Sequence, residues 1–192
     1  MPYAYVDFTA GPRHTEDVQL GDVSVGAFAS WHGKRLHGWI GPNIYFPTGS
    51  YDRLRAFNLG RNYGAASLQG GVSYFITPKL DVGVKGYYGI NQENRATHYQ
   101  SGQELAADYV AAYRVSPKLR VGINGYYYQQ ITDDKVAGVR PPGGARGEAF
   151  AIGPLLQVYF GRATAVIKYQ QEVYTENRAQ GGRLWIQTLV PF

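Results

Sequence analysis

The chain has 192 residues, no cysteine and a formal net charge of +5 at pH 7. The lack of cysteine excludes disulfides and thiolate metal sites, and charged residues interrupt every window of about 20 residues, which excludes a membrane-spanning helix. Lysine and arginine are scattered along the chain and form no basic stripe, so the positive charge does not indicate nucleic-acid binding.

Alternation of apolar and polar residues predicts ten strands along the chain. The composition agrees, since 17 tyrosines and 25 glycines against one methionine favour strands and tight turns. The segment 11–20 is expected to be a polar connection. The expected strands are residues 3–10, 22–31, 35–46, 64–76, 79–91, 103–115, 118–131, 148–160, 163–174 and 183–192.

A repeated segment gives the clearest strand pattern. PKLDVGVKGYYGINQ at 78–92 and PKLRVGINGYYYQQI at 117–131 share Pro-Lys-Leu, Val-Gly and Gly-Tyr-Tyr at matching positions. In each copy apolar residues occupy every second position, and polar residues or glycine lie between them. Each copy follows a Ser/Thr-Pro-Lys turn, so the repeating unit is a hairpin.

Short and long connections alternate from one strand to the next. In an up-and-down antiparallel sheet, this order places every tight turn at one end and every long loop at the other. The arrangement is typical of bacterial outer-membrane barrels, and strands of this length suit the hydrocarbon layer. We therefore predict an all-β fold, an antiparallel up-and-down transmembrane β-barrel that forms a single domain over residues 1–192.

A soluble barrel or sandwich would show the same alternation with its apolar face turned inward. Three features favour the membrane. Aromatic residues collect near strand ends, where an interfacial girdle needs them, and the face opposite the apolar one is rich in glycine, amides and charge, which suits a narrow lumen. The last strand carries Leu184, Ile186 and Val190 on one face and ends at Phe192, which resembles the assembly signal of outer-membrane barrels.

Blocks from residue 41 to the end resemble a known family. They are GPNIYFPTGSYDRLRAFNLGRNY at 41–63, NQENRATHYQSGQEL at 91–105, GINGYYYQQITDDK at 122–135, AIGPLLQVYF at 151–160 and the terminal phenylalanine. The family is that of outer-membrane proteins named for the meta-pathway of phenol degradation. The resemblance implies a barrel in the outer membrane of Gram-negative bacteria that takes up small hydrophobic compounds such as aromatics. Implied partners are lipid, lipopolysaccharide, the barrel assembly machinery and the solute, without nucleic acid or cofactor.

The family pattern also includes an export signal and further strands upstream. Residue 1 leads almost directly into the first expected strand, with no charged n-region or apolar h-region before it. We therefore expect a fragment that lacks the export signal and about two of about twelve strands. Ten strands would by parity permit closure through pairing of residues 3–10 with residues 183–192, whereas an incomplete barrel leaves unpaired backbone groups at its edges.

Polar residues on the strands are the candidates for lining the lumen. They are Asp81, Lys85, Tyr87, Asp108, Arg114, Arg120, Asn124, Tyr126, Lys168 and Glu172. A tight turn at 116–118 sets Val115 opposite Leu119 and Arg114 beside Arg120, and a matching register in the preceding loop sets Asp81 on the other side of Arg114. The resulting Asp81–Arg114–Arg120 cluster would brace a narrow lumen or act as a selectivity filter. A change at Asn124 is expected to be mild.

The sequence offers few candidates for catalysis. His98 and Ser101 share one loop, and Asp133 and Asp134 share another, which leaves an outer-membrane hydrolase conceivable. No G-x-S-x-G, HExxH or P-loop motif is present, and the other histidines show no metal-ligand spacing. The paired aspartates could equally hold a divalent ion that bridges lipopolysaccharide. We therefore predict no enzyme and no metal or cofactor site, and an uptake channel whose alternative is a structural barrel with a plugged lumen.

Overall fold

The computed structural model describes residues 3–190 and contains only strands and their connections in that range. Over the same residues there is no helix long and apolar enough to cross a membrane. The strands are β1 (Tyr3–Ala10), β2 (Arg13–Leu20), β3 (Val23–Gly26), β4 (Ala29–His32), β5 (Leu36–Phe46), β6 (Ala65–Phe75), β7 (Leu80–Asn91), β8 (Tyr99–Gln100), β9 (Glu104–Ser116), β10 (Leu119–Gln130), β11 (Lys135–Val136), β12 (Glu148–Phe160), β13 (Ala163–Glu176) and β14 (Gly182–Leu189).

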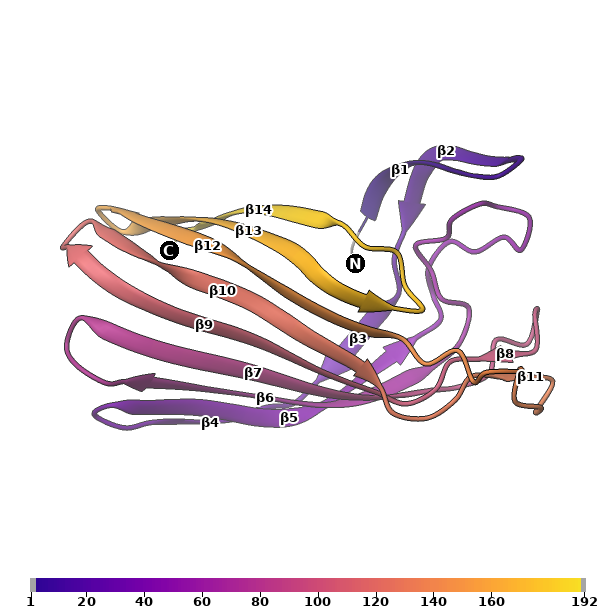
Figure 1. Ribbon diagram of the computed structural model, residues 1–192, viewed down its shortest axis with the longest axis horizontal. Helices are drawn as coiled ribbons and strands as arrows, with labels where there is room; N and C mark the ends of the chain where they lie inside the picture. Colours follow the sequence, from indigo (N-terminus) through magenta and orange to yellow (C-terminus); the bar gives the residue numbers. More distant parts are fainter. Residues whose placement is uncertain (1–2, 191–192) are drawn as a thin grey trace.

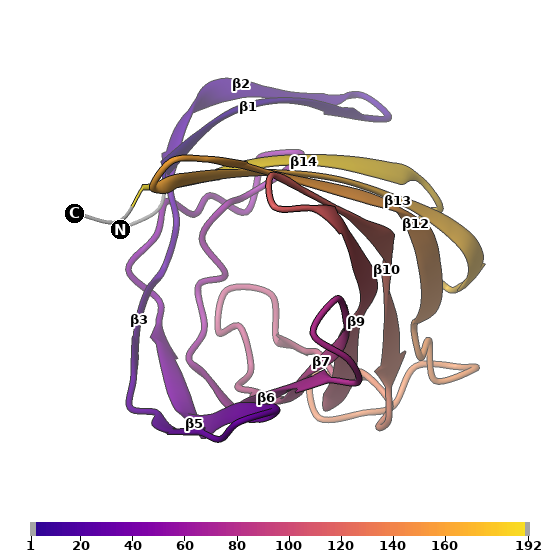
Figure 2. The ribbon, with the colours of Figure 1, turned by 90° about the vertical axis from the view of Figure 1, so that its left-hand side faces the viewer.

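Most of the chain forms one 10-stranded antiparallel sheet in the order β14-β13-β12-β10-β9-β7-β6-β5-β3, with β4 also paired to β5 (Figure 1). Figure 2 looks along the strands and shows this sheet curving into a wall that is open on one side. The sheet is not closed into a barrel, because β3 and β14 each have one neighbour among the described strands. The predicted antiparallel all-β fold is therefore present, but the predicted closure of the sheet into a barrel is not seen among the described strands.

The connections divide between the two ends of the sheet as predicted. Figure 1 places the tight turns at the left, which we call the turn end, and the long loops at the right, the loop end. In the turn between β6 and β7, the Thr77 hydroxyl accepts hydrogen bonds from the Lys79 and Leu80 backbone N–H groups at 3.2 and 2.9 Å. The Ser116 hydroxyl accepts one from Lys118 in the same way at 3.3 Å, so the two Ser/Thr-Pro-Lys segments are hairpin turns.

Two strand predictions near the N-terminus are wrong. Residues 11–20 contain β2, which pairs with β1 in a separate hairpin, so the parity argument based on ten strands fails and β1 does not pair with β14. Residues 22–31 form two short strands, although β3 and β4 keep one register against β5. The interruption at 27–28 lies opposite Pro42, which has no N–H to donate to the ladder.

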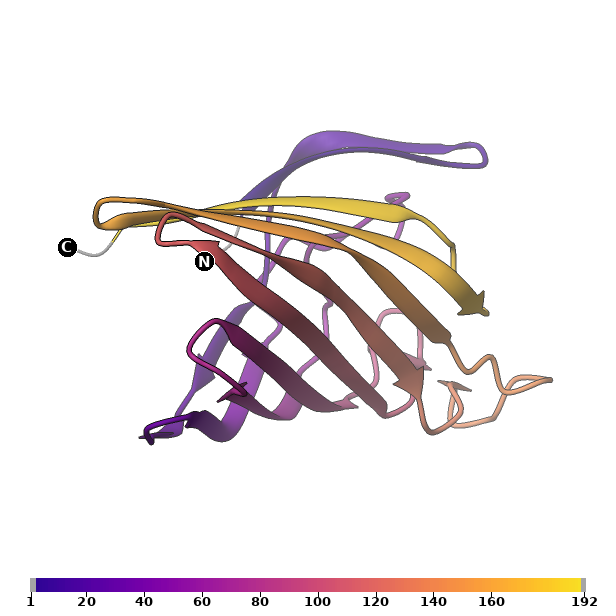
Figure 3. The ribbon, with the colours of Figure 1, turned by 60° about the vertical axis from the view of Figure 1, so that its left-hand side comes forward.

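The β1–β2 hairpin stands off the main sheet at the loop end (Figures 1 and 3). It packs against the loop between β5 and β6 through Phe8 and Phe57, whose ring centroids are 5.6 Å apart. The fully buried Gln19 side chain accepts from Leu59 N–H at 2.7 Å and donates to the Phe57 carbonyl at 3.2 Å. The hairpin therefore holds this long loop and is not a wall strand.

The two faces of the curved sheet have opposite polarity. Large apolar side chains cover the convex face and remain exposed, for example Ile40 at 48%, Ile123 at 50% and Ile186 at 71%. The concave face carries the buried polar side chains Asn43, Ser67, Asn91, Asn124, Gln170 and Glu172. Leu184 and Val190 are exposed on the same face as Ile186, whereas Phe192 lies outside the described residues. The sheet is thus apolar outside and polar inside.

Candidate functional site

The concave face encloses a cavity of about 620 Å³ between β4 and β14. Five of the ten lumen candidates line it: Lys85, Asp108, Arg120, Asn124 and Lys168. The other five flank it. Asp81 and Arg114 lie nearer the turn end, and Tyr87, Tyr126 and Glu172 lie nearer the loop end, because each occupies an earlier or later position on the same strands.

Asp81 and Arg120 form an ion pair on the cavity wall. Arg120 Nε donates to Asp81 Oδ1 at 3.0 Å, Nη2 donates to Oδ2, and Nη1 donates to Gln157 Oε1 at 2.7 Å. The side chains of Arg120 and Asp81 are only 14% and 16% exposed. Nε and Nη2 of Arg120 therefore bind Asp81 in the bidentate arrangement, which is the strong form of the arginine–carboxylate contact, and Nη1 is held by Gln157.

The expected three-residue charge cluster is only partly present. Arg114 lies opposite Arg120, as predicted, but Asp81 lies opposite Ala112 and not Arg114, two residues away from the expected register. A bulge at the turn also puts Ser116, not Val115, opposite Leu119. Arg114 turns instead to Tyr159, with the guanidinium carbon 4.9 Å from the ring centroid. A long loop does not restrict register, which explains the error.

Asn124 braces the wall and is 2% exposed. Its amide nitrogen lies 3.1, 2.8 and 3.2 Å from the carbonyl oxygens of Gly153, Pro154 and Tyr169. The ladder between β12 and β13 is interrupted at Gly153 and Pro154, so the Asn124 side chain replaces missing backbone donors. Contrary to the sequence-based expectation, we expect its replacement to be destabilising and not mild.

A belt of tyrosines crosses the concave face between the cavity and the loop end. The tyrosine belt consists of Tyr45, Tyr87, Tyr126 and Tyr128. Tyr126 and Tyr128 pack on Ala149 and Ala151, which are fully buried. Small residues on β12 thus leave room for two rings to lie against the wall.

Arginines from the loop end cover the tyrosine belt. Their guanidinium carbons lie 4.9, 4.0 and 5.1 Å from the ring centroids in the pairs Arg61–Tyr45, Arg178–Tyr128 and Arg183–Tyr126. These distances are suitable for cation–π attraction. The Gly-Tyr-Tyr repeat marks Tyr87 and Tyr126 in the sequence, but nothing local identifies Tyr45 or the arginines that contact the belt.

Two carboxylates, the buried Glu172 and the half-buried Glu104, complete the tyrosine belt. Glu172 accepts from Tyr126 Oη, from Gly181 N–H at 2.7 Å and from Arg183 Nη2 at 3.4 Å. Glu104, which the sequence analysis did not identify, accepts from Tyr87 Oη at 3.2 Å. Glu172 therefore ties the β13–β14 loop to the wall, and the predicted lumen residues Tyr87, Tyr126 and Glu172 belong to a bonded network.

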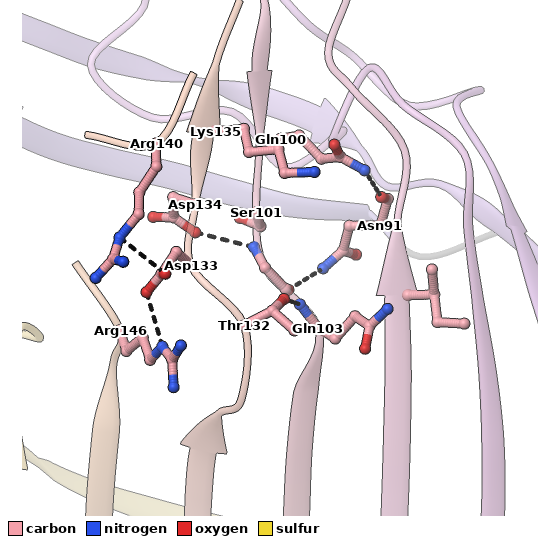
Figure 4. Close-up of a pocket in the computed structure, with 12 residues that line it drawn as sticks. Asn91, Gln100, Ser101, Gln103, Thr132, Asp133, Asp134, Lys135, Arg140 and Arg146 are labelled. Atoms are coloured by element: carbon pink, nitrogen blue, oxygen red, sulfur yellow. Dashed lines mark hydrogen bonds and ion pairs between the residues drawn. The ribbon is translucent and has the colours of Figure 1, made fainter. Parts of the chain in front are cut away.

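A second cavity, of about 360 Å³, lies among the long loops (Figure 4). Asp133 faces Arg140 and Arg146, with Nε–carboxylate distances of 2.9 and 2.7 Å. Asp134 faces the other way and accepts from Gly102 N–H at 2.9 Å, from Gln130 Nε2 at 2.6 Å and from Tyr99 Oη. The two carboxylates therefore do not converge on a shared divalent-ion site, and they join the loops instead.

The hydrolase candidates are also separated by their contacts. His98 Nδ1 lies 2.8 Å from Glu93 Oε1, so the imidazole pairs with this exposed carboxylate. Among the described residues it forms no hydrogen bond to Ser101. Within residues 3–190, no three His, Asp or Glu side chains gather in a way that could hold a metal ion.

We expect Asp133 to titrate below the usual aspartate pKa of about 3.9. The Arg146 hydrogen bond, with help from the nearby Arg140 charge, lowers the pKa of Asp133. Because the pKa of Asp133 is lower in the folded state, the ion pairs stabilise the loop fully at pH values above the usual aspartate pKa. This stabilisation is lost as the pH falls through the lowered pKa of the folded state. Carboxyl NMR shifts in detergent should report it.

The matched variants for this titration are Arg146→Gln and Arg162→Gln. Arg146→Gln should move the apparent pKa of Asp133 upward, since it removes the main stabilising donor. Arg162 lies in the turn between β12 and β13 at the opposite end, so Arg162→Gln should leave the value unchanged. Equal titration curves for both variants would contradict this description of the loop contacts.

This architecture is similar to that of a solved outer-membrane protein. The crystal structure of the COG4313 outer membrane channel from Pseudomonas putida F1 is similar, with a TM-score of 0.74 and 17% sequence identity over 91% of this chain. The match covers 66% of that channel, so the chain spans slightly less than two thirds of its length. At this level of identity the likeness shows a shared fold. No curated protein matches the sequence. The sequence model of the family described as "Putative MetA-pathway of phenol degradation" matches residues 1–188, and the chain therefore belongs to that family.

Proposed function

We propose that this chain forms the wall of an outer-membrane β-barrel channel that admits small hydrophobic compounds, aromatic ones among them. The observation that carries the proposal is the inverted polarity of the sheet. Exposed apolar side chains on this scale are unfavourable in water but suit contact with lipid. The polar concave face would then line the solute path.

The arrangement of the strands supports the same proposal. Strands of 11 to 14 residues form most of the main sheet, which is enough to cross the hydrocarbon layer at a tilt. Tight turns at one end and long loops at the other correspond to the periplasmic and extracellular sides of such barrels. The similar fold belongs to a protein described as an outer membrane channel, and the family description concerns phenol degradation.

The proposal includes a location and partners. We place the protein in the outer membrane of Gram-negative bacteria, in contact with lipid and with lipopolysaccharide around the loop end. The barrel assembly machinery would insert it. The role is transport without catalysis, because the residues considered for a hydrolase do not form a nucleophile–base pair.

One observation favours a second candidate, a barrel with a plugged lumen. The tyrosine belt, its arginines and its two carboxylates extend across the concave face between the cavity and the loops. If the tyrosine belt closes the passage, the loops alone would carry function. Conductance separates the two candidates, since an open lumen passes ions and a filled one does not.

We expect the protein reconstituted in a planar bilayer to conduct ions, and a small aromatic solute to reduce the current. Gly83 and Gly86 of β7 provide a matched pair. Gly83 lines the cavity, so Gly83→Phe should lower conductance by about half or more. Gly86 lies on the convex face, where a Cβ has no atom closer than the Gly70 carbonyl oxygen at 4.0 Å, so Gly86→Phe should have no effect. Folded wild-type protein that does not conduct would refute the channel and favour the plugged barrel.

A further inference from the structure

We propose that Trp185 and Lys168 form a binding subsite for single-ring aromatic compounds that carry a carboxylate. The proposal rests on the channel function above and narrows its substrate class. Trp185 of β14 and Lys168 of β13 lie directly opposite each other and both line the 620 Å³ cavity. Together they offer one group for a ring and one for a negative charge.

Trp185 is an oriented and accessible aromatic platform. Its indole Nε1 donates to Gln170 Oε1 at 3.1 Å, which satisfies the only polar atom and holds the ring in place. The side chain nevertheless remains 44% exposed on the polar concave face. Aromatic rings attract one another in offset or edge-on arrangements, so an exposed indole in a lumen suits a flat solute.

Lys168 supplies a cation that no carboxylate of the described residues neutralises. Its Nζ lies 5.8 Å from the Trp185 ring centroid, and its neighbours across the two adjacent strands are Leu155 and Trp185. Glu172, the next acid along β13, is occupied by Tyr126, Gly181 and Arg183.

The other cations of the cavity have acids near them in the sheet. Arg120 forms an ion pair with Asp81, and Lys85 lies directly opposite Asp108 in the ladder between β7 and β9. Lys168 differs because neither of its neighbours on the adjacent strands, Leu155 and Trp185, is an acid. A carboxylate beside Lys168 interacts more strongly in a narrow lumen than in bulk water.

The remaining wall suits a small ring. The cavity volume of about 620 Å³ leaves room for a one-ring compound. A second indole, Trp39 of β5, also lines it and is held edge-on by Phe28 at a centroid distance of 5.3 Å. Phenolic hydroxyls ionise near pH 10 and stay neutral at pH 7, whereas carboxylates are charged, so Lys168 favours aromatic carboxylates over phenols.

The test is calorimetric binding of three probes to the folded protein in detergent: benzoate, its neutral analogue benzamide, and cyclohexanecarboxylate, which lacks the aromatic ring. We expect wild-type protein to bind benzoate about fivefold to tenfold more tightly than either analogue. Lys168→Met should abolish the preference for benzoate over benzamide. Trp185→Leu should abolish the preference for benzoate over cyclohexanecarboxylate.

Two controls keep the result specific. Trp31 of β4 packs over Gly38 on the convex face, and Lys118 lies exposed in a turn, so Trp31→Leu and Lys118→Met should retain both preferences. Benzoate should also quench tryptophan fluorescence in wild type and Trp31→Leu, and should quench it less in Trp185→Leu, where Trp39 is the remaining indole on the cavity wall. Equal affinity of wild type for benzoate and benzamide, or an unchanged preference in Lys168→Met, would overturn the subsite. Benzoate binding is measured in detergent, and conductance is measured in a bilayer. A protein that conducts but does not prefer benzoate would refute the subsite and not the channel. A protein that prefers benzoate but does not conduct would refute the channel and not the subsite.

Discussion

Replacing Ile123 by arginine is expected to destabilise the protein folded in lipid by about 2 to 4 kcal/mol. Ile123 lies near the middle of β10, opposite Ala111 and Pro154, and is 50% exposed on the convex face. In a barrel wall this position faces hydrocarbon, where a guanidinium loses hydration without gaining a partner. Denaturant titration of the protein in lipid vesicles measures the free energy of unfolding.

Ser73→Arg is the matched control for Ile123→Arg. Ser73 of β6 is exposed on the concave face and lines the cavity, so an added arginine there can stay hydrated. We expect a cost below about 1 kcal/mol. Equal costs at the two positions, or a larger cost at Ser73, would mean that the concave face is the buried one and would restore the soluble barrel or sandwich.

Replacing Arg120 by methionine is expected to cost about 3 kcal/mol of folding stability. The change leaves Asp81 as an unpaired carboxylate in a wall position where it is only 16% exposed, and it also removes the donor to Gln157. Asp81→Asn in the Arg120→Met background should recover most of this loss, since the uncompensated charge is then gone. A double-mutant cycle from equilibrium unfolding gives the coupling energy.

Arg114→Met provides the comparison for Arg120→Met. Arg114 is exposed and stacks on Tyr159 without a carboxylate partner among the described residues, so its loss should cost less than about 1 kcal/mol. Similar losses for the two arginines, or no recovery in the double variant, would show that the Asp81–Arg120 pair does not brace the wall.

The repeated hairpin shows how far local pattern reaches. Apolar and polar residues alternate along 78–92 and 117–131, and side chains of a strand point to opposite faces with the same period. That period assigns Ile123 to one face and Asp81, Lys85 and Arg120 to the other without any tertiary information. The assignment of the lumen candidates to the concave face follows from this two-residue period. A register error of two residues, such as the one at Asp81, leaves each side chain on the same face of the sheet.

Contacts across long loops required the tertiary structure. The loop between β7 and β9 sets Asp81 opposite Ala112, two residues from the expected position, and so separates Asp81 from Arg114. The arginines that cover Tyr45, Tyr126 and Tyr128 come from loops or strand starts whose paths no alternation describes. The brace at Asn124 depends on an interruption in the ladder of two other strands, so its burial had no local signal.

The sequence by itself determined the all-β class, the order of turns and loops, and the polarity of each strand, because these follow from alternation and turn chemistry within a few residues. Only the tertiary structure decided that β2 pairs with β1 in a hairpin outside the main sheet and that Asp81 forms its ion pair with Arg120. It also decided that Lys168 lies opposite Trp185, with no acid opposite it. Those outcomes depend on which strands become neighbours and in what register. Loop-closure entropy changes slowly with loop length, so long loops leave register to the side chains that meet only after folding.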